Sequence, residues 1–192
     1  PPVGTRLYVD PPEIIDPTME PSSTFDINIT IDDVIDMRIC EFNLTYDTTV
    51  LGWFSIDILR VQGQMPRALT DANDEFGYVW IRLTYSTSVT TSDPIALVTI
   101  GFHVEAMGVS LLDLHDTELT DSVGQPIPHT AFDGFFATLI QDIAVTSAVP
   151  SKNWAYKGEL LNINVTAKNL GNMEESFEVK AYYDSAPIGT IP

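Results

Sequence analysis

The acidic segment at residues 70–77 holds the side chains best suited to binding an ion. Asp71, Asn73 and Asp74 supply carboxylate and amide oxygens, and Gly77 permits a tight turn. Calcium prefers such oxygen ligands, and the segment departs from the spacing of an EF-hand loop. We treat these three residues as candidate calcium ligands, although a solvated acidic hairpin connection is the favoured interpretation of the segment. Calcium is the sole cofactor that the sequence suggests.

Three asparagines stand in the N-glycosylation motif Asn-x-Thr, with no proline at x. They are Asn28, Asn43 and Asn164. Each lies in a segment where polar and apolar residues alternate, so we expect its side chain on the solvent face of a strand. Chance also produces such triplets, but three in one short chain favour a secreted glycoprotein.

The histidines and the single cysteine do not form a recognisable catalytic set. His103, His115 and His129 have no metal-binding spacing, and His129 in the sequence Pro-Ile-Pro-His is expected to order a loop. Cys40 alternates with apolar residues and is predicted to be a buried small hydrophobe. Carboxylates are too numerous for any pair to indicate a glycosidase. The sequence therefore predicts a protein that is not an enzyme.

Three tryptophans could stack against sugars: Trp53, Trp80 and Trp154. Trp80 lies within a dense apolar run, which favours a place in the core over a binding role. No planar aromatic strip can be assigned from the spacing. Polysaccharide binding is therefore an alternative rather than the leading interpretation.

An apolar–polar period of two dominates the first 140 residues and predicts β-strands. The predicted strands are residues 24–31, 39–46, 54–61, 78–85, 95–105, 110–114 and 132–139. Glycine, proline and aspartate separate these runs, as in a β-sandwich or barrel. The best helical candidate is one short turn near residues 66–69.

A domain boundary is expected near residues 140–141, which gives domains 1–140 and 141–192. The second block has three predicted strands, at residues 142–147, 160–167 and 176–183. Three strands can form one sheet but cannot cover it with a second. The block is therefore expected to be truncated or to be completed by another chain. Because the sequence starts at Pro1, we also expect that something upstream was removed or not included.

The chain is strongly acidic, with 27 Asp and Glu, 9 Lys and Arg, and a formal net charge of −18. Such a charge repels the phosphates of nucleic acids and anionic lipids, so neither is expected as a partner. No run of 18 apolar residues is present, so no membrane span is expected in this chain.

The first block resembles a cohesin-type domain over residues 6–140. The resemblance lies in residues 24–29, 41–47, 50–51, 97–102 and 119–122, and in Gly108, Gly124, Pro126-Ile127-Pro128-His129 and Asp133-Gly134. It implies an all-β, jelly-roll-like β-sandwich of about nine strands, from a superfamily that includes carbohydrate-binding modules. It also implies binding rather than catalysis, since cohesins hold a calcium-binding dockerin on one sheet face.

The second block resembles the start of a CARDB-type immunoglobulin-like repeat. The resemblance lies in residues 142–146, 158–159, 163–166 and 168–172, and in Pro150, Phe177, Tyr182-Tyr183 and Ile188-Gly189. It implies a partial immunoglobulin-like β-sandwich at residues 141–192. A cohesin-like module joined to such a repeat resembles archaeal cell-surface proteins.

Three functions remain open. The leading one is a non-enzymatic extracellular structural or adhesion protein of a cell surface or filament, which assembles with itself or with other surface proteins. Exposed edges of the incomplete second block could take a strand from a neighbour, which is strand complementation. The alternatives are a scaffolding module that binds a dockerin and a module that binds polysaccharide.

Overall fold

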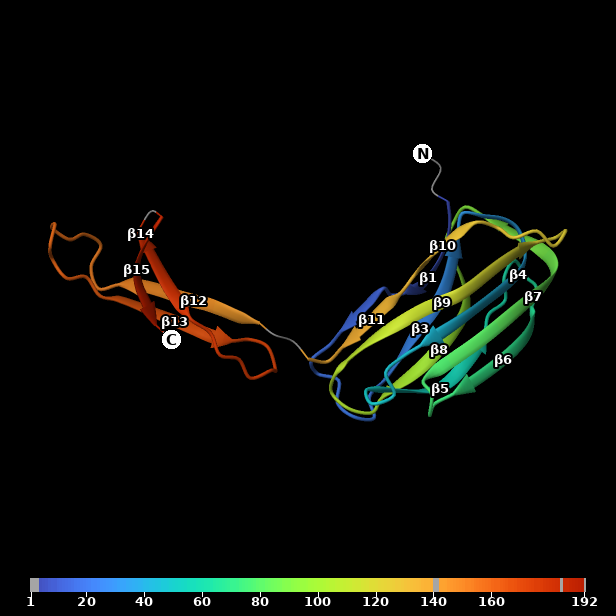
Figure 1. Cartoon of the computed structure of the whole chain (residues 1–192), viewed down its shortest axis with the longest axis horizontal. Helices are drawn as coiled ribbons and strands as arrows, with labels where there is room; N and C mark the ends of the chain where they lie inside the picture. The colour runs from blue at the N-terminus through green and yellow to red at the C-terminus, as the bar shows by residue number, and fades with distance from the viewer. Residues whose placement is uncertain (1–3, 140–141, 184, 192) are drawn as a thin grey trace. The chain divides into compact units, whose positions relative to one another are not determined.

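The computed structural model describes residues 4–139, 142–183 and 185–191. It divides into two compact units, Pro1–Thr138 and Leu139–Pro192. The boundary expected between residues 140 and 141 lies outside the described residues. All elements assigned in the described part of the chain are strands (Figure 1). A search of the same residues finds no helix long and apolar enough to cross a membrane.

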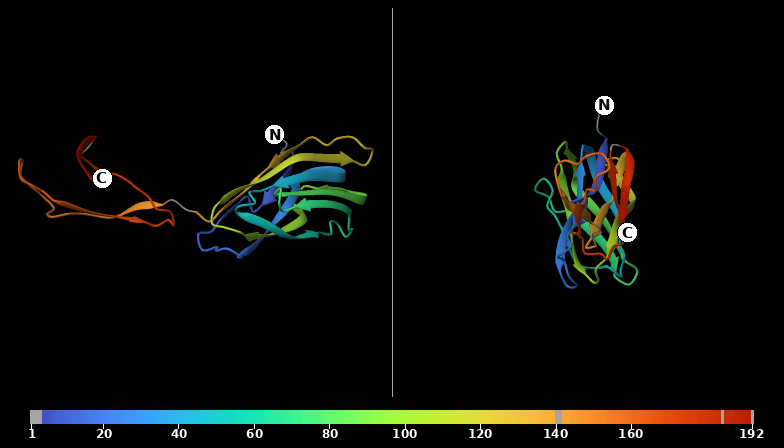
Figure 2. Two further views of the ribbon diagram at one scale, coloured as in Figure 1. Left: turned by 60° about the horizontal axis from the view of Figure 1, so that its bottom comes forward. Right: turned by 90° about the vertical axis from the view of Figure 1, so that its left-hand side faces the viewer.

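The first unit is a sandwich of two sheets that pack face to face (Figures 1 and 2). The five-stranded sheet has the order β10 (His129–Phe132), β1 (Thr5–Asp10), β3 (Thr24–Asp32), β8 (Ile95–Val104) and β5 (Leu51–Ile58). The six-stranded sheet has the order β2 (Glu13–Ile15), β11 (Gly134–Ala137), β9 (Val109–Asp121), β4 (Val34–Thr45), β7 (Tyr78–Thr91) and β6 (Arg67–Asn73). The predicted all-β, jelly-roll-like sandwich is confirmed.

The core fills the space between the two sheets, because alternate residues of each strand point inward. Ile29 and Phe102 come from the five-stranded sheet, Phe42 and Ile81 from the six-stranded sheet, and all four are fully buried. Burying one such side chain contributes about 1.5–3 kcal/mol. Cys40 is buried beside Phe42, as the sequence predicts.

The first unit has eleven strands where about nine are expected. The difference arises at two places where the chain passes from one sheet to the other. Between β1 and β2 the change occurs at Pro11-Pro12, and between β10 and β11 it occurs at Asp133. A proline has no N–H to donate to the neighbouring strand, so the strand is interrupted at Pro11-Pro12. Counting each interrupted pair as one bent strand restores the expected number.

The short helical turn predicted near residues 66–69 is wrong. Residues 67–69 begin β6, which pairs antiparallel with β7 from Arg67↔Thr84 to Asn73↔Tyr78. Ala68 and Ala72 pack against the core, while Leu69 and Asp71 between them face outward. Pairing with β7 and the burial of two small side chains outweigh a weak local preference.

The second unit consists of two separate two-stranded sheets in the part of the chain that the structure describes. β12 (Ile143–Pro150) pairs with β13 (Ile163–Asn169), and β14 (Val179–Tyr183) pairs with β15 (Ala186–Ile191). Many of its apolar side chains face solvent: Val145, Val149, Leu160 and Leu170 are 59, 56, 91 and 57% exposed. The unit therefore leaves much of its apolar surface uncovered.

Candidate protein-binding face

Strands β6, β7, β4 and β9 present a broad surface of the six-stranded sheet on the side away from the core, and we call this surface the outer face. The strand register aligns side chains into three neighbouring rows. They are Asn73–Tyr78–Thr45–Asp113, Asp71–Trp80–Asn43–His115 and Leu69–Arg82–Glu41–Glu118. Side chains in one row lie about 4.5–5.5 Å apart at Cβ, so each row is a continuous contact surface.

Glu41 organises the centre of the outer face. Its Oε1 accepts a hydrogen bond from Trp80 Nε1 at 3.0 Å, and its Oε2 pairs with the Arg82 guanidinium. One carboxylate therefore fixes an aromatic and a cationic side chain from the neighbouring strand. Trp80 is half-buried on this outward surface, so its predicted place in the core is wrong. Because Trp80 alternates along the strand with the buried Val79 and Ile81, its side chain points away from the core.

A bulge in β9 shapes the next part of the outer face. The register shifts between the pairs Glu41↔Glu118 and Asn43↔His115, and the inserted Asp116 has a φ of 49°. Asp116 Oδ2 accepts a hydrogen bond from Asn43 Nδ2 at 3.4 Å and lies 3.0 Å from His115 Nδ1. Such bulges redirect side chains. Here the bulge ties β4 and β9 together through polar groups.

The β2–β11–β9 side of the same sheet carries an exposed apolar patch, which we call the apolar end. Ile15 and Val109 both flank Ala137 in the register, and Leu111 pairs with Phe135. Ile15, Val109 and Leu111 are 51, 49 and 52% exposed. Contiguous exposed apolar residues of this kind often mark an interaction surface. The sequence did not single out this patch, because its residues come from three segments.

The candidate calcium ligands lie near the β6–β7 turn, but each accepts hydrogen bonds from different donors within the protein. Asp71 Oδ2 accepts from the Tyr78 hydroxyl at 3.1 Å, and Asn73 Oδ1 accepts from an amide at 3.2 Å. Asp74 Oδ1 accepts from the Tyr46 hydroxyl at 2.7 Å and from Trp53 N at 3.2 Å.

Burial and this bond to Asp74 raise the pKa of Tyr46, so its hydroxyl stays protonated and continues to donate. Within the described ranges, no three His, Cys, Asp or Glu side chains are arranged to hold a metal. Calcium binding at this turn stays a prediction.

The three glycosylation motifs lie in three different strands. Asn28 lies in β3 and Asn43 in β4, and both are half-buried strand residues. Asn164 lies in β13 and is exposed. Their modification stays a prediction.

Cys40 and His129 have structural surroundings. Burial raises the pKa of the Cys40 thiol to about 12, which disfavours the reactive thiolate. His129 Nδ1 lies 2.9 Å from the Ile127 carbonyl oxygen, and its Nε2 lies 2.9 Å from Thr117 Oγ1. His129 therefore joins the start of β10 to β9, in keeping with the expected ordering role.

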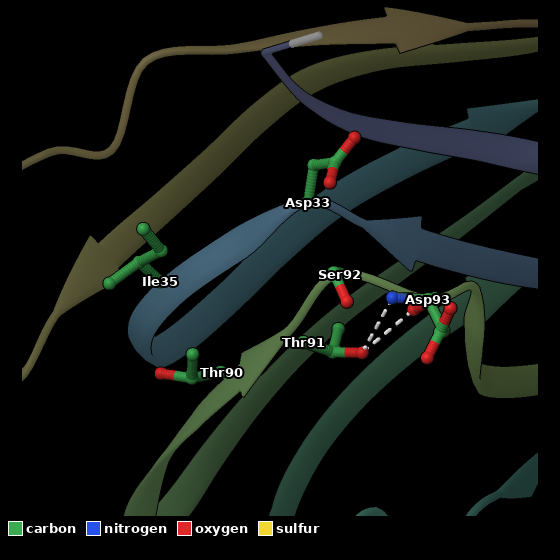
Figure 3. A pocket seen from close by; sticks show the side chains of 6 residues that line it. All are labelled: Asp33, Ile35, Thr90, Thr91, Ser92 and Asp93. Carbon is green, nitrogen blue, oxygen red and sulfur yellow. Dashed lines mark hydrogen bonds between the residues drawn. The ribbon is translucent and has the colours of Figure 1, made fainter. Parts of the chain in front are cut away.

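A pocket of about 620 Å³ opens beside the β3–β4 turn and the β7–β8 connection (Figure 3). It is lined by Asp33, Ile35, Thr90, Thr91, Ser92 and Asp93. The Thr91 hydroxyl donates to the Asp93 carbonyl at 2.8 Å and accepts from its amide at 3.0 Å. The lining contains two carboxylates and no cationic side chain, so the pocket does not suit an anion.

Comparisons with solved structures support the cohesin resemblance at the level of fold. A non-cellulosomal cohesin from the hyperthermophilic archaeon Archaeoglobus fulgidus is 13% identical, with a TM-score of 0.58 over 70% of this chain and 90% of its own. The sixth cohesin of Acetivibrio cellulolyticus scaffoldin B, solved with the Cel5 dockerin, is 17% identical, with a TM-score of 0.55. That match covers 70% of this chain and 99% of the cohesin chain. The OlpA cohesin of Clostridium thermocellum, also solved with a dockerin, is 10% identical, with a TM-score of 0.58. That match covers 70% of this chain and 98% of the cohesin chain.

No protein-family model and no curated protein matches the chain. At these identities the structural likeness shows the fold alone. The first unit is thus a cohesin-like β-sandwich.

Proposed function

We propose that the chain is a non-catalytic assembly module that binds a dockerin-like protein through the outer face of β6, β7, β4 and β9. The observation that carries the proposal is the outer face itself, where Trp80, Arg82 and Tyr78 stand side by side. Tryptophan, tyrosine and arginine are the residues enriched at the energetic centres of protein interfaces. The cohesin-like fold supports the same proposal.

The face also indicates the chemistry of the partner. Glu41 holds Trp80 and Arg82 in place before any partner arrives, which lowers the entropy lost on binding. The apolar end offers Ile15, Val109 and Leu111 to apolar side chains. Because the chain carries a net charge of −18, basic residues on a partner would speed its approach. A helical domain with an apolar stripe and flanking lysines or arginines fits these features.

A binding role without catalysis agrees with the chemistry of the described residues. The only cysteine is buried and holds its proton, and His129 is tied to a carbonyl and a hydroxyl. Neither residue is arranged as an activated nucleophile or its base.

The second candidate function is a structural or adhesion protein of a cell surface or filament that assembles with copies of itself or with other surface proteins. The second unit favours it, because β12–β13 and β14–β15 expose strand edges and apolar side chains. A strand from a neighbouring chain could complete such a sheet. The CARDB-type, immunoglobulin-like resemblance and the glycosylation motifs support an extracellular location. Polysaccharide binding is less favoured, because Trp53 and Trp80 lie in strands of different sheets.

Calorimetric titration of the full chain with purified dockerins tests the proposal. The Cel5 dockerin of Acetivibrio cellulolyticus is the first probe, together with a panel of other dockerins, in calcium and in chelator. We expect saturable one-to-one binding to a member of the panel in calcium and its loss in chelator, since dockerins bind calcium. No binding to any dockerin, together with concentration-dependent self-association in sedimentation, would support the second candidate instead.

A further inference from the structure

The three glycosylation motifs lie in surroundings that differ in access to their side-chain amides. We propose that Asn164 is the glycan acceptor of the folded chain, whereas Asn28 and Asn43 stay unmodified, so that the outer face stays open. The consequence for the outer face rests on the proposed function. The assignment of the acceptor rests on the geometry alone.

Asn164 has the most accessible amide of the three. It lies in β13, which pairs only with β12 among the described strands. The side chain is exposed and has no hydrogen-bond partner in the part of the chain that the structure describes. The neighbouring Thr166, which completes the motif, is also exposed. A transferase can therefore reach the whole motif without opening the sheet.

Asn28 is held within the five-stranded sheet. It lies in β3 between β1 and β8, where it is opposite Asp10 on one side and Thr99 on the other. The Thr99 hydroxyl donates to Asn28 Oδ1 at 2.7 Å, and the asparagine is half-buried. Its partner in the motif, Thr30, is 3% exposed. Modification would require local opening of a central strand.

Asn43 is held in the same way on the opposite sheet, at the centre of the outer face. Its neighbours in the row are Trp80 on β7 and His115 on β9. Its Nδ2 atom, which would accept the sugar, donates to Asp116 Oδ2. An oligosaccharide at this position would cover Trp80, so a glycan at Asn43 and a docked protein exclude each other.

The chemistry of the modification is a glycosyl transfer. The bond that forms joins Asn164 Nδ2 to the anomeric carbon of the sugar. The bond that breaks joins that carbon to the phosphate of an activated donor, a nucleotide-linked or lipid-linked sugar, and the diphosphate leaves with the bonding electron pair. One amide proton passes to a base of the transferase, and nothing is oxidised or reduced.

The experiment compares the folded and the unfolded full chain. Protein from a host without N-glycosylation is incubated with a soluble asparagine glucosyltransferase and UDP-glucose, and the occupancy of each motif is measured by peptide mass spectrometry. The unfolded reference is chain held in urea at a concentration that the transferase tolerates. We expect Asn164 in the folded chain to be modified at least about tenfold faster than Asn28 or Asn43, whose access requires local opening.

In the unfolded chain we expect the three rates to converge. Asn164→Gln should abolish transfer to the folded chain, and Asn28→Gln should leave it unchanged. Rapid modification of folded Asn43, or no modification of folded Asn164 while the unfolded chain reacts, would overturn the inference. Because this measurement needs no binding partner, its outcome is independent of whether a dockerin binds.

Discussion

At the scale of single residues, Glu41 shows how one side chain can prepare a binding surface. Its two carboxylate oxygens engage Trp80 and Arg82 separately, so both side chains keep one orientation on the outer face. Exposed ion pairs contribute little to stability, typically about 0–1 kcal/mol. The value of this arrangement therefore lies in the geometry that it gives to the face rather than in the free energy of folding.

The close packing of Gly134 leads to a prediction about stability. A Cβ atom at this position would lie 2.5 Å from Val9 Cγ1 and 3.3 Å from Leu112 Cβ, both of which are buried. We expect Gly134→Ala to lower the free energy of unfolding by about 1–3 kcal/mol, as overpacking does. Urea denaturation of the purified variant measures the change.

Gly4→Ala is the matched control, because a Cβ atom there meets nothing within 4 Å. We expect a change within about ±0.5 kcal/mol for this surface substitution. Equal stability of the two variants would contradict the packing described for β1, β9 and β11.

At the scale of elements, the turn between β4 and β5 depends on Asp47. Its Oδ1 accepts from the Thr49 amide at 2.8 Å and from the Thr49 hydroxyl at 2.6 Å. These hydrogen bonds lower the pKa of Asp47 below its ordinary value of 3.8. Because the folded-state pKa is lowered, the ionised carboxylate stabilises the folded state above pH 3.8, and the contribution is lost as the pH falls through the lowered value.

We therefore expect Asp47→Ala to lower the melting temperature at pH 7, with the difference from the parent chain shrinking below about pH 4. Thermal unfolding followed by circular dichroism from pH 7 to pH 3 measures it. A difference that grows on acidification would show that Asp47 does not act through its ionised form.

The strands that carry a strict apolar–polar alternation could be predicted from the sequence. β3, β4, β7 and β8 lie where that alternation is longest. β6 was not recognised, because its inward residues are two alanines and its pairing with β7 is a long-range effect. β1 and β2 were missed because two prolines interrupt a short apolar run.

The candidate site was less predictable than the fold. The outer face depends on the register of β6, β7, β4 and β9, which brings together residues up to 77 positions apart, such as Glu41 and Glu118, only through strand pairing. Alternation with Val79 and Ile81 was the signal that could have placed Trp80 outward. The apolar end had no local signal, since no motif links Ile15 to Val109.

At the scale of the whole molecule, the first unit contains its own core and both of its sheets. Its eleven strands pair only with one another, and its buried cluster is drawn from residues 7–136. The second unit has no comparable cluster of buried apolar residues in its described part. The two units are therefore expected to differ in stability.

We predict that a chain shortened to residues 1–138 keeps the main unfolding transition of the full chain. Its melting temperature should change by no more than about 2–4 °C, which corresponds to roughly 1 kcal/mol for a domain of this size or slightly larger. Calorimetry of both chains provides the measurement. A shortened chain that is unfolded at room temperature would show that the first unit depends on the second.

The central claim is that the outer face of β6, β7, β4 and β9 is the surface that binds a protein partner. The most direct measurement compares dockerin binding by Trp80→Ala with binding by Phe132→Ala. Phe132 is an aromatic residue of the other sheet that is more exposed than Trp80, with 47% of its surface accessible on β10. Thermal melting of both variants confirms that each remains folded.

We expect Trp80→Ala to weaken binding by about 30-fold or more, as for an energetic centre worth about 2 kcal/mol, and Phe132→Ala to leave the affinity unchanged. The opposite pattern, with full affinity retained by Trp80→Ala and lost in Phe132→Ala, would move the binding surface to the five-stranded sheet and contradict the proposed function of the outer face.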